Sequence, residues 1–207
     1  MDLVFEPDAV VVVAGVPGAG KSTLIRRAVD RDVATVIDTD DERARGHGGR
    51  LLYARHYLRI AAALARRRPV VIHSRGTRSP ARRAIALLAR LRGRPAHLLL
   101  LDADRPAAEA GQRARGRVVD AEVMDREWAR WRRLRASSVV AGEGWRSVRV
   151  MSRTEAALVG SVGWNAVAGT PTMEAHTPLG TTGFDVVGSW GRLRVEVPEA
   201  SLNPGKP

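Results

Sequence analysis

The segment that most constrains the fold of this chain is Gly15-Val16-Pro17-Gly18-Ala19-Gly20-Lys21-Ser22. It matches the pattern G-x-x-x-x-G-K-[ST], the P-loop, in which glycines let the backbone curl so that successive N–H groups point inward. The motif should follow a buried strand and open a helix. Residues 9–14 are a continuous apolar run rich in valine, and residues 22–29 are predicted to be helical, so the sequence meets both conditions.

The P-loop residues are candidate ligand contacts. The backbone N–H groups and the Lys21 ammonium suit phosphate oxygens, and the Ser22 hydroxyl suits Mg²⁺. Lys21 is one of only two lysines in a chain whose other basic residues are all arginine. We therefore expect a nucleoside triphosphate site made by the following residues: Gly15, Gly18, Ala19, Gly20, Lys21, Ser22 and Thr23.

Apolar runs alternate with helical periods from residue 9 to about residue 160, which predicts a parallel sheet with helices on both faces. The five predicted strands are residues 9–14, 34–37, 70–73, 96–101 and 147–151. The expected fold class is α/β, a three-layer P-loop NTPase fold with a five-stranded parallel sheet, occupying residues 1–163. Residues 164–207 are rich in Gly, Thr, Pro and Ser, so we expect a poorly structured tail in which only residues 184–187 and 193–197 resemble strands.

Two of the predicted helices carry apolar stripes at helical spacing, and these stripes should face the core. The predicted stripes are Tyr53, His56, Tyr57, Ile60 and Leu64 in the first helix, and Ala84, Leu88 and Leu91 in the second. Ser79-Pro80 should begin the second helix. In a later helix that starts at Asp120, we expect Trp128 and Trp131 to pack onto the sheet, with a platform for stacking bases as the alternative.

The amino-acid composition limits which binding partners and which cellular compartment we expect. The formal net charge of +12 predicts attraction to polyanions such as nucleic acid, although the arginines could equally solvate helix faces. The absence of cysteine excludes disulfides and thiolate ligands, and the five scattered histidines do not form a ligand-like cluster. No apolar run reaches 18 residues and the first eight residues are acidic, so we expect a cytoplasmic protein with no membrane partner.

Further candidate residues follow the predicted strands. Carboxylates in residues 38–42 come at the carboxyl end of the second strand, where ligands bind in open α/β sheets. A carboxylate there can accept the proton of an attacking hydroxyl, or it can simply cap a helix. The arginines Arg113, Arg115 and Arg117 could neutralise a transferring phosphoryl group, or belong to a solvated helix end. Arg75, in the loop after the third strand, could hold an anionic substrate.

The chain lacks the N-K-x-D base-recognition signature of Ras-like GTPases, and it lacks the length and the acidic strand end of a motor ATPase. These absences favour a compact phosphotransferase.

The order of motifs resembles the polynucleotide-kinase-like group of small P-loop kinases, which includes zeta-toxin-like and antibiotic-phosphorylating kinases. The resemblance spans about residues 9–140. Residues 15–23 reproduce the group's G-x-P-G-[SA]-G-K-S-T signature, and residues 40–43 are similar to its D-D-x-R sequence. The resemblance implies ATP and Mg²⁺ as cofactors, Asp40 as general base, Arg43 as a substrate contact, and Arg113 with Arg117 as phosphate-contacting lid arginines. Arg115 competes for the lid role.

One position departs from that group. After the third strand such kinases usually carry an acidic D-T-N element, whereas here Ser74-Arg75-Gly76-Thr77 follows. An arginine in this place suggests an anionic acceptor bound at Arg75. The expected function is ATP-dependent phosphoryl transfer to a hydroxyl acceptor, nucleic acid among the candidates. The alternatives are a small-molecule kinase acting on a nucleoside, sugar or antibiotic, and a nucleotide-dependent binding module with little catalysis.

Overall fold

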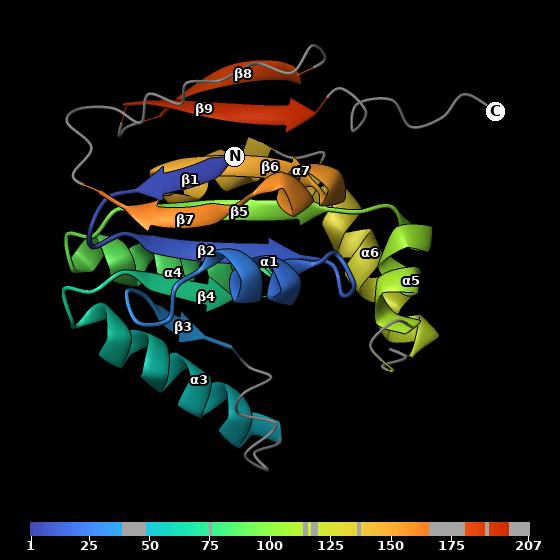
Figure 1. The fold of residues 1–207 in the computed structure, drawn as a ribbon, viewed down its shortest axis with the longest axis horizontal. Helices are drawn as coiled ribbons and strands as arrows, with labels where there is room; N and C mark the ends of the chain where they lie inside the picture. The colour runs from blue at the N-terminus through green and yellow to red at the C-terminus, as the bar shows by residue number, and fades with distance from the viewer. Residues whose placement is uncertain are drawn as a thin grey trace.

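The computed structural model of the 207-residue chain describes residues 1–38, 49–74, 76–113, 116, 120–135, 138–165, 181–188 and 191–198. Its core is a parallel sheet with the strand order β3-β4-β2-β5-β6 (Figure 1). The strands are β2 (Val10–Gly15), β3 (Thr35–Ile37), β4 (Val70–His73), β5 (Ala96–Asp102) and β6 (Ser147–Ser152). These are the five predicted strands, so the predicted five-stranded parallel sheet is confirmed.

The strand that leads into the P-loop lies at the centre of this sheet. All six residues of β2 are buried, and Val12 is in register with Ile72 of β4 on one side and with Leu98 of β5 on the other. A strand covered on both faces needs apolar side chains at every position, which explains the unbroken valine run. The P-loop therefore leaves the sheet at the middle of its carboxyl edge.

Helices cover both faces of the sheet, which confirms the predicted three-layer arrangement. In Figure 1, α1 (Lys21–Ala28) and α7 (Arg153–Leu158) lie in front of the sheet and α4 (Ser79–Leu91) lies behind it. The remaining helices are α3 (Gly49–Leu64), α5 (Arg105–Arg113), α6 (Ala121–Arg135) and the 3₁₀ helix η1 (Ser138–Glu143). Among the described helices, none combines the length and the apolar character that a membrane span requires.

Four further strands lie outside the five-stranded core. β1 (Asp2–Phe5) pairs in parallel with β7 (Ser161–Trp164). β8 (Thr181–Gly188) and β9 (Gly191–Pro198) form an antiparallel pair that contains both predicted tail strands, and β9 continues the main sheet beside β6. Of the expected tail, Trp164 ends β7 and Asn165 donates a backbone hydrogen bond to Phe5. The tail residues other than these two and the strands β8 and β9 lie outside the described residues.

The predicted stripe of α4 is wrong. Its buried face consists of Arg82, Ile85, Ala86 and Ala89, whereas Ala84 is exposed, Leu88 is half-buried and Leu91 is 70% exposed. The helix turns this face inward because the Arg82 guanidinium is paired with the buried Glu143 carboxylate at 2.7 Å. A pattern search that counts only apolar residues leaves out such a buried charge.

The predicted stripe of α3 is correct in part. His56, Ile60 and Leu64 are buried as expected, but Tyr53 is 51% exposed and Tyr57 is 37% exposed. The apolar face of α3 is therefore narrower than the spacing predicted.

Trp131 packs in the core, as expected for this position in α6. It is fully buried, and its Nε1 donates a hydrogen bond to Oδ1 of Asp102 at 2.9 Å. This burial rules it out as a platform for stacking bases. Trp128 is partly buried and packs against the same core.

Candidate functional site

The P-loop joins β2 directly to α1. Gly18 (φ 88°) and Gly20 (φ 99°) adopt left-handed backbone conformations that other residues rarely reach, and Gly20 is the N-cap of α1. The N–H groups of Thr23 and Leu24 donate to the Gly20 carbonyl at 3.0 and 2.9 Å, so the helix begins at once. This geometry gives the loop the helix N-terminus and the left-handed glycines that phosphate binding uses.

The Lys21 side chain lies within the loop. It is only 6% exposed, and its Nζ donates hydrogen bonds to the carbonyl oxygens of Gly15 and Val16, both at 2.8 Å. A buried ammonium needs such acceptors, since burying a charge without partners is costly. A phosphate oxygen entering the loop would offer this ammonium a charged acceptor, with which hydrogen bonds are roughly twice as strong as with neutral ones.

Helix α5 packs against the tip of the P-loop. A side chain at Gly18 would overlap the carbonyl oxygen of Ala108, and a Cβ at Gly111 would lie 2.7 Å from the Gly18 carbonyl oxygen. Nε2 of Gln112 donates to the Pro17 carbonyl at 3.4 Å. The backbone of α5 thus touches the loop through two glycines, and a change in the loop's conformation must be accommodated by this helix.

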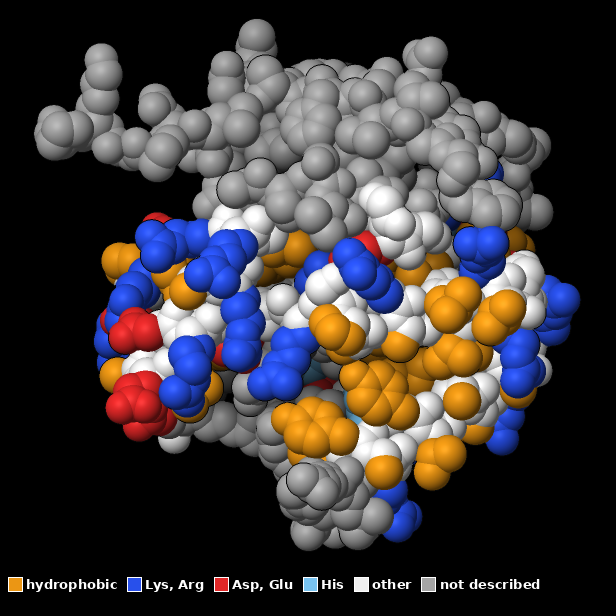
Figure 2. Space-filling view, turned by 180° about the vertical axis from the view of Figure 1, so that it is seen from behind, with side chains coloured by type: hydrophobic (Ala, Val, Ile, Leu, Met, Phe, Trp, Pro, Cys, Tyr) orange, Lys and Arg blue, Asp and Glu red, His pale blue; other side chains and the backbone are white. Residues whose placement is uncertain are grey.

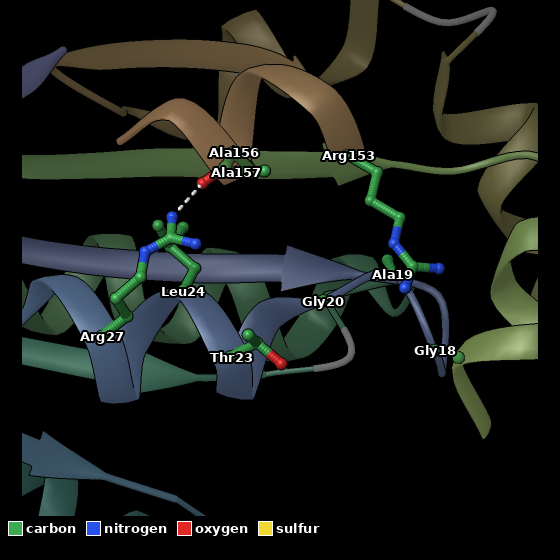
Figure 3. A pocket seen from close by; sticks show the side chains of 10 residues that line it. Gly18, Ala19, Gly20, Thr23, Leu24, Arg27, Arg153, Ala156 and Ala157 are labelled. Atoms are coloured by element: carbon green, nitrogen blue, oxygen red, sulfur yellow. Dashed lines mark hydrogen bonds between the residues drawn. The ribbon is translucent and has the colours of Figure 1, made fainter. Parts of the chain in front are cut away.

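A cavity of about 300 Å³ opens beside the P-loop (Figure 3). Its walls come from the loop, α1, α5 and α7, and consist of Gly18, Ala19, Gly20, Thr23, Leu24, Arg27, Gly111, Arg153, Ala156 and Ala157. The volume lies at the lower end of the range typical of small-molecule sites. Its position next to the phosphate loop suits the nucleoside part of a nucleotide.

Two arginines line this cavity, and each bridges helices that are distant in sequence. Nη2 of Arg27 donates to the carbonyls of Ala156 at 2.6 Å and Val159 at 3.0 Å, and Nη1 of Arg153 donates to the Ala107 carbonyl at 2.7 Å. In Figure 3, Arg153 extends from α7 toward Ala19. Sequence reasoning missed Arg27, Gly111 and Arg153. The rule that ligands bind beyond the carboxyl ends of parallel strands could have found Arg153, because it directly follows β6.

At the carboxyl ends of β3 and β4, the structure brings Asp38 and His73 together. Nδ1 of His73 lies 2.6 Å from Oδ2 of Asp38, and the two side chains are 12% and 14% exposed. The contact has the distance of an ion pair, although its angles are not those of a hydrogen bond. Sequence reasoning placed a carboxylate cluster here and did not single out Asp38 or His73.

The other predicted site residues divide into two groups. Arg113 is the last residue of α5 and its side chain is exposed. Asp40, Arg43, Arg75, Arg115 and Arg117 lie outside the described residues.

The predicted Mg²⁺ contact also fits its surroundings. Ser22 is the second residue of α1 and is half-buried at the mouth of the loop. Within the described part of the chain, no group of three or more His, Asp or Glu side chains could hold a metal ion. A single hydroxyl suits an ion that keeps several waters and arrives bound to nucleotide phosphates, as Mg²⁺ does.

A comparison with solved structures agrees with this fold. The chain is similar to a structure of the PezAT chromosomal toxin-antitoxin system of Streptococcus pneumoniae, with 13% identity and a TM-score of 0.56 over 74% of this chain and 71% of that one. A likeness at this identity shows a shared fold alone. A gluconokinase from Sinorhizobium meliloti 1021 (17% identity, TM-score 0.46, 61% and 76% covered) and the Pnkp1/Rnl/Hen1 complex (18%, 0.43, 56% and 41%) also match. Among curated proteins, none matches this sequence.

A family model described as "AAA domain" matches residues 10–137. The matched region begins at β2, contains the P-loop and runs to the end of α6. Because the match covers more than half of the 207 residues, the chain belongs to this AAA domain family, a P-loop kinase-like family.

Proposed function

We propose that this chain transfers the γ-phosphoryl group of ATP to a hydroxyl group of an acceptor, with Mg²⁺ as cofactor. The observation that carries the proposal is the buried Lys21 ammonium held inside the P-loop, next to a cavity of about 300 Å³ lined by two arginines. Phosphoryl transfer is catalysed mainly by positioning and by charge stabilisation, and this edge of the sheet supplies donors for both.

The donor nucleotide would lie across the P-loop. The backbone of Gly15, Gly18, Ala19 and Gly20 and the first residues of α1 would bind its phosphates, with Lys21 as the cation nearest to the transferred group. The Ser22 hydroxyl would bind Mg²⁺, which would neutralise charge on the phosphates. The nucleoside would occupy the cavity between α1 and α7, against Arg153.

The acceptor would approach the carboxyl ends of β3 and β4. The family resemblance assigns proton acceptance to Asp40, a substrate contact to Arg43 and the phosphate-covering lid to Arg113 and Arg117. Arg75 would contact an anionic group of the acceptor. This site would operate in the cytoplasm, where ATP is abundant.

The surface on this side suits an acceptor with anionic and planar groups. Figure 2 shows hydrophobic side chains gathered over α3 and α4 beside a band of Lys and Arg side chains. Among the side chains of these helices that the structure describes, the large hydrophobic ones that are exposed are Tyr53, Tyr57, Leu58, Leu87 and Leu91. Burial raises the pKa of the Tyr57 phenol, so this ring stays neutral at physiological pH. Aromatic faces beside arginines bind nucleic acid bases and phosphates, which favours a nucleic acid acceptor over a sugar.

The test is transfer of labelled phosphate from ATP to a panel of acceptors, namely 5′-hydroxyl oligonucleotides, nucleosides, sugars and aminoglycosides. Lys21→Ala should abolish ATP binding, whereas Asp40→Asn should abolish transfer while ATP still binds. Asp41→Asn is the matched control, since it removes the neighbouring carboxylate and should leave transfer within a few-fold of the unchanged protein. ATP binding without transfer to any acceptor would refute the kinase proposal in favour of a binding module.

A further inference from the structure

The Asp38–His73 contact joins two strand ends that are neighbours in the sheet but far apart in the chain. β3 pairs in parallel with β4, with Ile37 opposite Ile72, so the next residue of each strand lies side by side. The Asp38 carboxylate and the His73 imidazole meet there at 2.6 Å and are both largely buried. A carboxylate beside an imidazole stabilises the positive charge that the ring gains when it accepts a proton.

His73 also lies beside the strand that carries the P-loop. It is in register with Val13 of β2, two residues before the loop begins at Gly15, and the N–H of the following residue, Ser74, donates to the Val13 carbonyl at 3.0 Å. The P-loop and the imidazole therefore occupy the same carboxyl edge of adjacent strands. Nδ1 is the buried nitrogen that faces Asp38, so a proton from an acceptor would have to be taken by the other ring nitrogen, Nε2.

We propose that His73, paired with Asp38, accepts the proton of the acceptor hydroxyl during phosphoryl transfer. The inference rests on the proposed function and gives the imidazole the role that the family resemblance assigns to Asp40, leaving Asp40 to orient the acceptor. The O–H bond of the acceptor breaks and its proton goes to Nε2 of His73. The oxygen forms a bond to the γ-phosphorus, and the bond from that phosphorus to the bridging oxygen breaks, so that its electron pair leaves with ADP.

An imidazole is better matched to this task than an isolated carboxylate. A general base is most effective when its pKa lies near the working pH, and imidazoles titrate much closer to neutral pH than carboxyl groups do. β3, α3 and α1 pack against β4, and the titratable groups at these elements are Asp38, which follows β3, the buried His56 of α3, and the buried Lys21, which begins α1. β2, the other neighbouring strand, carries no such side chain.

The reaction with water as acceptor tests the proposal without an identified substrate. The rate of labelled phosphate release from γ-labelled ATP is measured from pH 5 to pH 9 in the full chain. We expect the rate of the unchanged protein to fall on the acidic side of this range, the acidic limb of the profile, because a protonated base can no longer accept a proton. His73→Gln should be about 100-fold slower at pH 8, within the usual contribution of a general base, and should lose this acidic limb. Asp38→Asn should lower the maximal rate while the KM for ATP stays unchanged.

His97→Gln is the matched control. His97 also pairs with a carboxylate, since its Nε2 lies 2.8 Å from Oε2 of Glu6, but it sits at the amino end of β5, on the opposite edge of the sheet. This variant should keep both the rate and the acidic limb. His73→Ala with added free imidazole gives a second readout, because a small base that fits the vacated space should restore part of the rate, whereas a purely structural role would not be rescued.

The outcomes separate this inference from the proposed function. If His73→Gln keeps the rate and the limb, while Asp40→Asn removes both, the proton acceptor is Asp40 and the inference is wrong although the kinase proposal stands. If the unchanged protein binds ATP but transfers its phosphoryl group neither to water nor to any acceptor in the panel, the proposed function fails and the inference fails with it.

Discussion

Replacing Arg82 by methionine should destabilise the fold far more than the same replacement at Arg83, the next residue of α4. Arg82 is 2% exposed, and its Nε and Nη2 donate to the two carboxylate oxygens of Glu143 at 2.9 and 2.7 Å. Its Nη1 donates to the carbonyl of Gly76. The Glu143 side chain has no exposed surface. The substitution therefore leaves a fully buried carboxylate without the cation that binds both of its oxygens.

The expected cost follows from what remains around Glu143. Removing one partner of a buried ion pair typically costs about 3–5 kcal/mol. The hydroxyl of Ser79 at 3.0 Å and Nε1 of Trp145 at 3.1 Å would still donate to the carboxylate, which places the loss near the lower end of that range. The Gly76 carbonyl also loses its donor, which adds about 1 kcal/mol. We expect Arg82→Met to lower the free energy of unfolding by about 3–4 kcal/mol.

Arg83 provides the matched control, because it is 60% exposed and its Nε lies 3.8 Å from Glu143. Arg83→Met should cost less than about 1 kcal/mol, as exposed ion pairs do. The assay is urea unfolding followed by circular dichroism, with the slope compared between variants. Adding Glu143→Leu to Arg82→Met should recover part of the loss, since no buried charge then remains unpaired. An Arg82→Met protein within 1 kcal/mol of the unchanged chain, or a double variant whose losses simply add, would refute the reasoning.

Three further predictions concern other parts of the molecule. A hydrogen bond with His97 lowers the pKa of the Glu6 carboxyl, so the ionised form stabilises the fold above the unfolded-state pKa and this contribution is lost as the pH falls through the lowered folded-state value. Glu6→Gln should therefore be less stable than the unchanged chain at pH 7, and the difference in unfolding free energy should shrink as the pH falls through the lowered folded-state pKa; a difference that does not shrink on acidification contradicts this. Gly111→Ala should push α5 away from the P-loop and weaken ATP binding by about tenfold in a calorimetric titration, while Gly142→Ala, whose added Cβ meets nothing within 4 Å, should leave binding unchanged. Ending the chain after Asn165, the last described residue before β8, should preserve folding and ATP binding if the predicted boundary near residue 163 separates a domain from an appendage, and a truncated chain that fails to fold would show that the boundary is wrong.

The sequence predicted the sheet well because a strand buried on both faces leaves an unbroken apolar run. β2 and β5 are such strands, and the predicted ends of all five core strands lie within one residue of the observed ones. The β1–β7 pair was not predicted, because its two short strands lie about 160 residues apart and only half of β1 is buried. Local patterns predict elements, whereas pairing between distant segments requires the assembled fold.

The residues of the candidate site also fall into two groups, those that a local sequence pattern predicts and those that only the fold brings together. The P-loop is a local motif, so its glycines and Lys21 could be read directly from their spacing. Arg27 and Arg153 line one cavity only because α1 and α7 lie side by side, which spacing within either helix does not reveal. Similarly, the Asp38–His73 contact depends on β3 being the neighbour of β4, and the sequence predicted both strands without their order.

Buried charged side chains of α4 and α6 contact the loop that follows β4. This loop packs against β2, the strand that leads into the P-loop. Gly76 (φ 65°) leaves no room for a side chain against Ala14, the residue before the P-loop. Arg82 binds the carbonyl of this glycine, and the hydroxyl of Thr77 donates to the buried Glu127 of α6. An apolar core would bury the same surface without the cost of desolvating two charges, so a stability argument alone does not account for this network. Directional hydrogen bonds do account for it, because they fix the path of one loop relative to the P-loop, and an acceptor hydroxyl must be held to within a fraction of an ångström for transfer to occur.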